Sequence, residues 1–161
     1  MFQGSSKLMR LTYLLLGHRR EVIECMDKVQ KIFDFACQGL SFNNVCKNIK
    51  PIKVENDKLI CQFEVEPELS NSAKTLHGGY ISHAVDFITS MDLVRHGFLS
   101  HVSVNLNVSY MKPGMLGSLV RTESTVLRKG KKLAFMDIKF YDDKKNTLLA
   151  SGCHTKFILD F

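Results

Sequence analysis

The sequence predicts an α+β domain in which an antiparallel sheet is wrapped around one long helix, with a further helix near the N-terminus. Residues 101–110 alternate apolar and polar side chains, which is typical of a half-buried strand. Residues 78–91 instead carry apolar side chains at helical intervals. The strands that follow are joined by short turns, so they must pair antiparallel. Such a sheet has to bury its apolar face, and the long helix is the obvious cover.

The first element is expected over residues 21–36. Its apolar side chains recur at intervals of three and four, as in an amphipathic helix: Val22, Ile23, Met26, Val29, Ile32, Phe33 and Ala36. We interpret it as a helix packed on the body of the domain. Between residues 47 and 66 the period changes to two, because Cys61, Phe63 and Val65 alternate with polar residues. That segment predicts a half-buried strand.

The second half of the chain holds the clearest patterns. The long helix has its apolar stripe at Ile81, Ala84, Val85, Ile88 and Met91, and Gly97 fits its C-terminal end. In the next strand one face is expected to carry Val102, Val104, Leu106, Val108 and Tyr110. Further strands are predicted at residues 118–128, 133–141 and 147–159, separated by turn sequences rich in Lys, Gly, Asp and Asn.

Composition limits the function classes. The 161 residues are enough for one domain with a core, and the net charge of +6 suits an anionic partner. No run of Lys and Arg is interleaved with aromatic residues, which argues against nucleic acid. The five cysteines are odd in number and lack C-x-x-C spacing. We interpret them as reduced thiols of an intracellular protein and expect neither disulfides nor a zinc site.

The first 20 residues form a basic extension, and residues 21–161 form the folded domain. The extension contains Lys7, Arg10, Arg19 and Arg20 and no acidic residue. This pattern fits either a mitochondrial targeting segment or a basic N-terminus without a targeting role. Both cytoplasm and mitochondrion are therefore expected locations. The apolar run at residues 11–17 is far too short to span a membrane.

The chemistry is expected where the long helix begins. Helix N-termini present unpaired N–H groups, and a glycine such as Gly78 lets an anion approach them closely. Asp86 lies about two turns further on, beside the apolar stripe. A carboxylate placed there is costly unless it is paired or used. Its structural alternative is a hydrogen bond to neighbouring backbone or to Ser90.

Metal and serine-triad chemistry find no support. The six histidines include no H-E-x-x-H pair, and we expect Asp92 and His96 to form a surface pair. No G-x-S-x-G motif is present, so Ser82 and Ser90 would be helix serines without a nucleophile elbow.

Three segments together resemble the PaaI-like hotdog-fold acyl-CoA thioesterases. They are LSNSAKTLHGGYISHAVDFITSM at 69–91, VSVNLNVSYMKPGMLG at 102–117 and VLRKGKKLAF at 126–135. The resemblance runs from about residue 21 to residue 157. It implies a sheet around a central helix, as expected above. It also implies a homodimer with a continuous sheet, commonly doubled to a homotetramer, with two composite active sites at the subunit interface.

The resemblance implies roles for five residues. Asp86 matches the catalytic carboxylate of the facing subunit, and Ser103 matches a strand serine that helps it orient water. Gly78 matches the glycine whose amide polarises the thioester carbonyl, in a turn that begins at His77. Asn71 matches a polar residue that helps to position substrate or water.

Coenzyme A, as part of the substrate, is the only cofactor-like group implied. The residues expected along it are Asn105, Tyr110, Met111, Lys112, Pro113, Gly114, Met115, Arg128, Lys129, Gly130, Lys131, Lys132, Leu133 and Phe157. The basic turn among them is well suited to phosphates. Taken without the resemblance, that turn would be read as a solvated hairpin tip.

The implied reaction is hydrolysis of medium- to long-chain fatty acyl-CoA to free acid and coenzyme A. Asp86 would deprotonate water as a general base, since a free Asp titrates at about 3.9. The Gly78 amide would stabilise the oxyanion. Direct attack by Asp86 through an anhydride stays open. The rival functions are a non-enzymatic acyl-CoA-binding protein and an enoyl-thioester hydratase.

Overall fold

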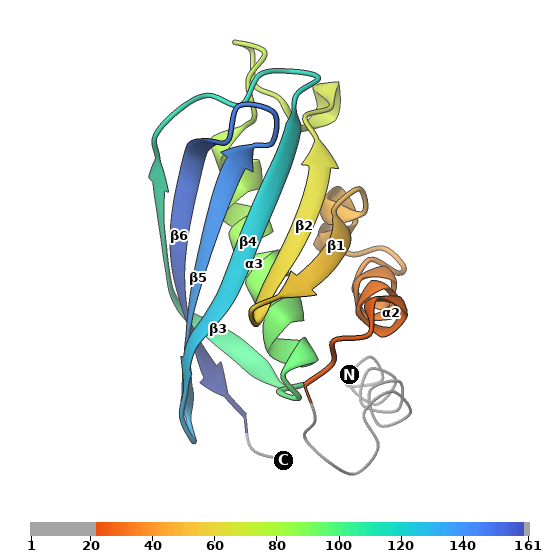
Figure 1. The fold of residues 1–161 in the computed structure, drawn as a ribbon, viewed down its shortest axis with the longest axis vertical. Helices are drawn as coiled ribbons and strands as arrows, with labels where there is room; N and C mark the ends of the chain where they lie inside the picture. The colour runs from red at the N-terminus through yellow and green to blue at the C-terminus, as the bar shows by residue number, and fades with distance from the viewer. Residues whose placement is uncertain (1–21, 160–161) are drawn as a thin grey trace.

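The computed structural model of the chain describes residues 22–159, so the basic extension at 1–20 lies outside the described residues. An antiparallel sheet of six strands, in the order β1-β2-β4-β5-β6-β3, curves around helix α3 (Figure 1). Helix α2 lies beside β1. The predicted α+β class, with a sheet around a long helix, is confirmed.

The described residues form three kinds of element. The helices are α2 (Met26–Ala36) and α3 (Gly78–Arg95), and the short 3-10 helices are η1 (Phe42–Cys46) and η2 (Pro67–Leu69). The strands are β1 (Lys50–Glu55), β2 (Lys58–Glu64), β3 (His101–Tyr110), β4 (Leu119–Lys129), β5 (Leu133–Asp142) and β6 (Thr147–Ile158). Within residues 22–159 no helix is long and apolar enough to cross a membrane.

Helix α3 begins and ends where the sequence indicates. The His77 ring caps its first turn, because Nδ1 accepts a hydrogen bond from the Gly79 N–H at 2.9 Å. At the other end Gly97 has a φ of +85°, a conformation that favours glycine. The predicted stripe is buried from Ile81 to Ile88, and its contact with the sheet forms the core.

The sheet face that contacts α3, called the inner face here, comes very close to the helix at one point. A Cβ atom on Gly152 of β6 would lie 2.8 Å from Cγ2 of Val85. Only glycine permits this approach. Side chains of β6 on either side of Gly152 are thereby brought within reach of α3.

The predicted alternation in β3 is wrong over its first half. Ser103 pairs with Lys156 and Asn105 pairs with Thr155, so Val104 is an extra residue of the β-bulge type. Ser103 therefore reaches α3, whereas Val102 and Val104 are 49% and 58% exposed. The bulge explains the bend that carries the start of β3 under the end of α3 (Figure 1).

The N-terminal helix starts later than predicted. It begins at Met26 instead of residue 21, and Cys25 before it has an extended conformation. Ile23 is buried, but its N–H donates to the Arg95 carbonyl at the end of α3. A contact with a distant helix end thus replaces the first helical turn.

One strand was expected between residues 47 and 66, and the structure has a hairpin. Strands β1 and β2 pair antiparallel around Asn56 and Asp57, which have φ values of +50° and +61°. Positive φ at both central residues is typical of a tight hairpin turn.

The expected surface pair of Asp92 and His96 is in fact buried. The two residues are 0% and 2% exposed. Asp92 accepts hydrogen bonds from Arg95 Nε at 2.9 Å and from Ser124 Oγ at 2.7 Å. Buried charges are tolerated when they are paired in this way, and this network ties the end of α3 to β4.

Candidate active site

Asp86 lies in the middle of α3 and faces β3 and β6. Its Oδ1 atom accepts hydrogen bonds from Lys156 Nζ at 2.6 Å and from Ser103 Oγ at 3.1 Å. Ser90 Oγ, the alternative partner considered from the sequence, is 3.4 Å from the same oxygen. The structure therefore brings the predicted pair of Asp86 and Ser103 together, and the carboxylate is neither isolated nor fully buried.

Sequence reasoning missed Lys156 and His154, which complete this cluster. His154 Nε2 lies 3.1 Å from Ser103 Oγ and Lys156 Nζ donates to the same hydroxyl at 3.0 Å. A signal was present, because the period of two in β6 places both residues on the face of Gly152, which is otherwise apolar. Polar side chains on a buried face call for a partner there.

The cluster keeps one negative and one positive charge. Burial pushes the pKa of Asp86 up, but the hydrogen bond and charge of Lys156 outweigh burial and hold the pKa below its usual value. Burial, with the nearby Lys156 charge, lowers the pKa of His154 to about 4. At neutral pH Asp86 is ionised and the imidazole is neutral.

The start of α3 forms a second polar region. The Gly79 N–H is bound to His77. The Gly78 N–H lies in the first turn of α3 and therefore has no acceptor within the helix. The Tyr110 hydroxyl donates to the Gly78 carbonyl at 3.1 Å and lies 2.6 Å from Ser82 Oγ. Tyr110 thus packs against the turn whose amide, by the family resemblance, is expected to bind the oxyanion.

A cavity of about 200 Å³ opens beside this turn. It is lined by Phe42, Val45, Glu68, Leu69, Ser70, His77, Gly79, Tyr80 and His83. Most of its aromatic and aliphatic lining comes from η1 and the first turn of α3. An apolar group bound at the helix start would find room there.

Asn71 is engaged in its own loop. Its Oδ1 atom accepts from the Ala73 and Thr75 N–H groups, and its Nδ2 donates to Thr75 Oγ1 at 2.9 Å. These bonds fix the loop that leads into α3. The expected role of Asn71 in positioning substrate or water stays a prediction.

The two polar regions are separated along the helix. Asp86 follows Gly78 by eight positions, which at 1.5 Å per residue is about 12 Å. A single water or thioester carbonyl cannot contact both groups at that distance. Within one chain, the Asp86 carboxylate and the Gly78 amide therefore lie too far apart to act on the same bound group.

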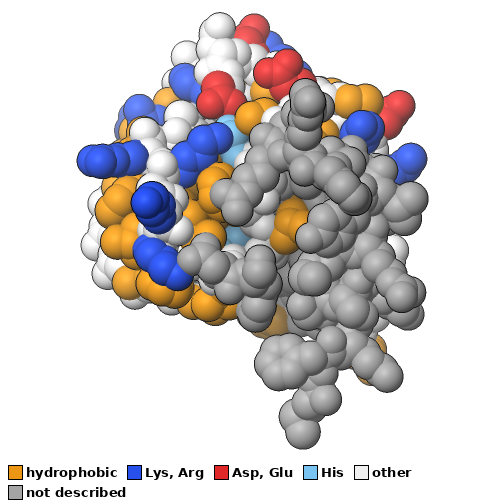
Figure 2. Space-filling view, turned by 90° about the horizontal axis from the view of Figure 1, so that it is seen from below, with side chains coloured by type: hydrophobic (Ala, Val, Ile, Leu, Met, Phe, Trp, Pro, Cys, Tyr) orange, Lys and Arg blue, Asp and Glu red, His pale blue; other side chains and the backbone are white. Residues whose placement is uncertain are grey.

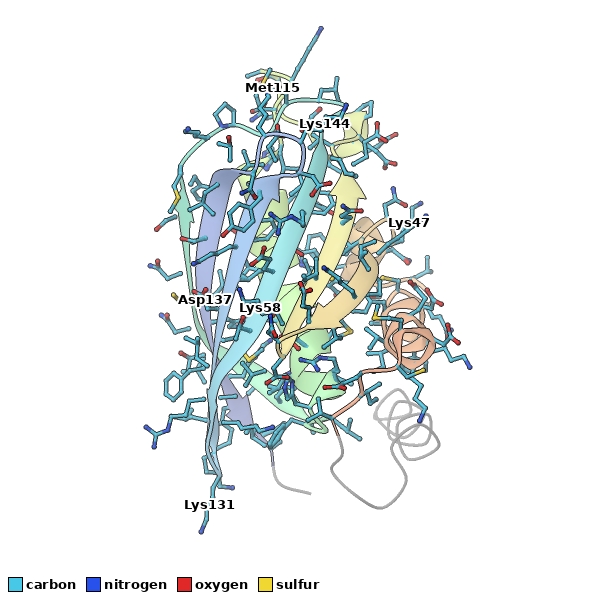
Figure 3. All side chains as sticks on the ribbon, in the orientation of Figure 1. Lys47, Lys58, Met115, Lys131, Asp137 and Lys144 are labelled. Atoms are coloured by element: carbon cyan, nitrogen blue, oxygen red, sulfur yellow. The ribbon has the colours of Figure 1, made fainter. Side chains whose placement is uncertain are left out.

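The residues expected along coenzyme A also fall into two groups. Met115 and Lys131 lie at opposite ends of the sheet (Figure 3). Cross-strand pairing places Phe157 beside Leu133 on the outer face, and Asn105 lies beside Thr155 one row away. Hydrophobic and basic side chains lie side by side at this end (Figure 2), where Leu127, Leu133 and Phe135 are exposed together with Arg128, Lys129, Lys131 and Lys132.

Metal binding finds no site in the part of the chain from residue 22 to residue 159. No group of three or more His, Cys, Asp or Glu side chains there could hold an ion.

Comparison with known proteins gives consistent matches. The model of the thioesterase superfamily matches residues 73–149. Human acyl-coenzyme A thioesterase 13 is 34% identical over 140 residues, which cover 86% of this chain and 93% of the human protein.

Two solved structures are similar over most of the chain. Mouse thioesterase superfamily member 2 matches with a TM-score of 0.76 at 30% identity, covering 82% of this chain and 96% of its own. The zebrafish protein of the same name matches with a TM-score of 0.78 at 29% identity, covering 83% and 98%.

Proposed function

The chain belongs to the thioesterase superfamily, and we propose that it hydrolyses medium- to long-chain fatty acyl-CoA to free fatty acid and coenzyme A. It is a thioesterase, as the family model and the human relative show, and its match to the mouse and zebrafish structures shows the hotdog fold. Chain length and the catalytic residues belong to the proposal. The reaction needs water and no separate cofactor.

Asp86 is the observation that carries the proposal. Its side chain is 43% exposed, and Lys156 and Ser103 hold one of its oxygens. An ionised carboxylate that is anchored on one side and open on the other can orient and deprotonate water. In the proposed mechanism Asp86 is the general base. Attack by Asp86 itself through an anhydride is the competing route.

The Gly78 N–H supplies the other half of the chemistry. It stands at the positive end of an 18-residue helix, where developing negative charge is stabilised. The adjoining cavity of about 200 Å³ has room for part of the acyl group. Its lining by Phe42, Val45 and Leu69 suits a hydrocarbon chain.

The separation of about 12 Å between Asp86 and Gly78 supports a homodimer. In the proposed assembly each site takes the helix start from one copy and the carboxylate from the other. Strand β3 is suited to the contact, because among the described residues it pairs only with β6 and forms one edge of the sheet. Antiparallel pairing of β3 with its copy would also join the two groups of coenzyme A residues.

Thiol release from acyl-CoAs of several chain lengths tests the proposal. We expect release with the wild type, and in Asp86→Asn a rate lower by at least about a hundredfold with unchanged assembly. Asp34→Asn, at an exposed position of α2, is the matched control and should keep full activity. Absence of thiol release at every chain length would overturn the proposal, as would hydration of enoyl-CoA without release.

Single-turnover hydrolysis in ¹⁸O-labelled water separates the two mechanisms. Label is expected only in the fatty acid, because the general base does not bond to the acyl carbon. Label on the Asp86 carboxylate would replace general-base catalysis by the anhydride route.

A further inference from the structure

A lysine is buried directly beneath the proposed general base. The side chain of Lys156 is 3% exposed, and Nζ donates to Asp86 Oδ1 at 2.6 Å and to Ser103 Oγ at 3.0 Å. Building on the proposed function, we propose that Lys156 is a positioning residue for hydrolysis. Its ammonium group clamps Oδ1 of Asp86, so that Oδ2 is presented to the water.

The contacts of the carboxylate are one-sided. Lys156 and Ser103 donate to Oδ1, and His154 Nε2 lies 3.7 Å from the same atom. Ser90 Oγ is 3.4 Å from Oδ1 and donates to the Asp86 carbonyl at 2.6 Å. Within residues 22–159, Oδ2 has no hydrogen-bond donor. Since the side chain is 43% exposed, the free oxygen is the one available to solvent and substrate. One oxygen holds the group in place and the other remains to act as the base.

Lys156 is a more reliable donor to Asp86 than Ser103, because the hydroxyl of Ser103 has only one proton. The Thr89 hydroxyl donates to the Val85 carbonyl at 2.7 Å, so the His154 ring must donate to Thr89 from Nδ1. His154 Nε2 is then an acceptor and competes with Asp86 for the single proton of Ser103. Lys156 has three protons and no acceptor, so it can bind Asp86 and Ser103 at the same time.

The lysine also supplies the charge that keeps Asp86 ionised. The titratable groups around the carboxylate are His83 on α3, Cys46 on η1, His101 on β3, and His154 and Lys156 on β6. Burial lowers the pKa of His101 and His154 to about 4 and also lowers that of His83. Burial raises the pKa of the Cys46 thiol to about 12. At pH 7 these four groups are neutral. Burial lowers the pKa of Lys156 itself, while the hydrogen bond and charge of Asp86 oppose that shift and favour the ammonium group as the compensating charge.

Substitution of Lys156 by Met, which keeps an unbranched side chain one atom shorter and removes the ammonium group, tests the proposal. We expect kcat to fall about a hundredfold with little change in KM, since a mispositioned base slows only the chemical step. The acidic limb of the pH profile should move to higher pH, because burial of Asp86 is then uncompensated. Lys156→Arg should restore the limb and part of kcat.

Two further measurements keep the interpretation unambiguous. The Asp86 carboxyl titration, followed by ¹³C NMR, should move to higher pH in Lys156→Met, and this readout needs no turnover. Lys139→Met, an exposed lysine on β5, should match the wild type in every assay. If the Met variant does not fold, Lys156→Gln, which keeps a donor without the charge, takes its place.

The outcomes separate this proposal from the function on which it rests. An unchanged kcat and acidic limb in Lys156→Met, with only a lower melting temperature, would show that Lys156 is merely structural. An unshifted Asp86 titration would overturn the clamp as well. Absence of thiol release by the wild type would instead overturn the proposed function, whatever the lysine variants do, and full activity in Asp86→Asn would remove Asp86, and with it Lys156, from the mechanism.

Discussion

The hydroxyl of Thr89 lies 2.8 Å from Nδ1 of His154 and fixes which ring nitrogen carries the proton. The contact spans α3 and β6, and both residues are buried. His154 is therefore held as a neutral ring with its lone pair toward Ser103. Burial is the larger cause of the low pKa of His154. The charge of Lys156 is the second cause, because protonation of the ring would place another positive charge beside it.

Acidification should destabilise the fold through His154. Its pKa is about 4 in the folded state and about 6.5 when unfolded, so the unfolded chain binds the proton first as pH falls. Its contribution is present above pH 6.5 and is lost as pH falls toward 4. Between pH 7 and pH 5 this amounts to about 2 kcal/mol. Urea unfolding at the two pH values should show that much less pH dependence in His154→Gln, and an equal dependence would contradict the assignment.

Adding one methyl group at Gly152 should strain the junction of sheet and helix. The new Cβ would meet Val85 at 2.8 Å, so we expect Gly152→Ala to lower the free energy of unfolding by about 1–3 kcal/mol. Val85→Ala makes space, so the double variant should be more stable than the sum of the single effects predicts. Urea denaturation of all four proteins measures the coupling, and strictly additive values would refute it.

Removing the buried guanidinium of Arg95 should be far more damaging than breaking a surface ion pair. Arg95→Met leaves Asp92 buried without its main partner, at a cost of about 3–5 kcal/mol. Lys58→Met breaks a partly exposed pair with Glu123 and should cost less than about 1 kcal/mol. Asp92→Asn combined with Arg95→Met should recover part of the loss. Comparable costs for the Arg95 and Lys58 variants would be incompatible with this account.

The basic turn between β4 and β5, at residues 128–132, should affect binding of the coenzyme A moiety and not the chemical step. We expect replacement of Arg128 and Lys131 by Ala to raise KM for acyl-CoA and to leave kcat unchanged. The rise should be about tenfold for each phosphate that loses its cationic partner. An acyl-pantetheine thioester without the phosphates should show no such change. Lys144→Ala, at the opposite end of the sheet (Figure 3), is the matched control. An equal rise in KM for both thioesters would remove the phosphates from the explanation.

The elements that could be predicted from the sequence are those set by local period. Helix α3 follows from its apolar stripe and from Gly97 at its end, and β5 follows from alternation through Ala134, Met136 and Ile138. These signals depend on neighbours within a few positions. The pairing of Asp86 with Ser103 can also be predicted, although from the family resemblance and not from the period.

What the sequence does not show depends on contacts between distant segments. The bulge at Val104 leaves the alternation of residue types unchanged, so the pattern continues while the faces exchange. The link from Ile23 to Arg95 and the approach of Lys156 to Asp86 each join residues that are far apart in the chain. Burial of Asp92 likewise depends on Ser124 from another strand. No window of local sequence contains both partners.

The open edge of β3 has a consequence for the protein in concentrated solution. Among residues 22–159 no second strand pairs with this ten-residue strand, and such an edge is a template on which other chains can add. Its exposed Val102 and Val104 offer no charge to oppose such growth. In the proposed dimer each copy closes the edge of the other, so assembly would end at two chains at that edge. The pairing that completes two reaction centres would then also keep the protein from aggregating.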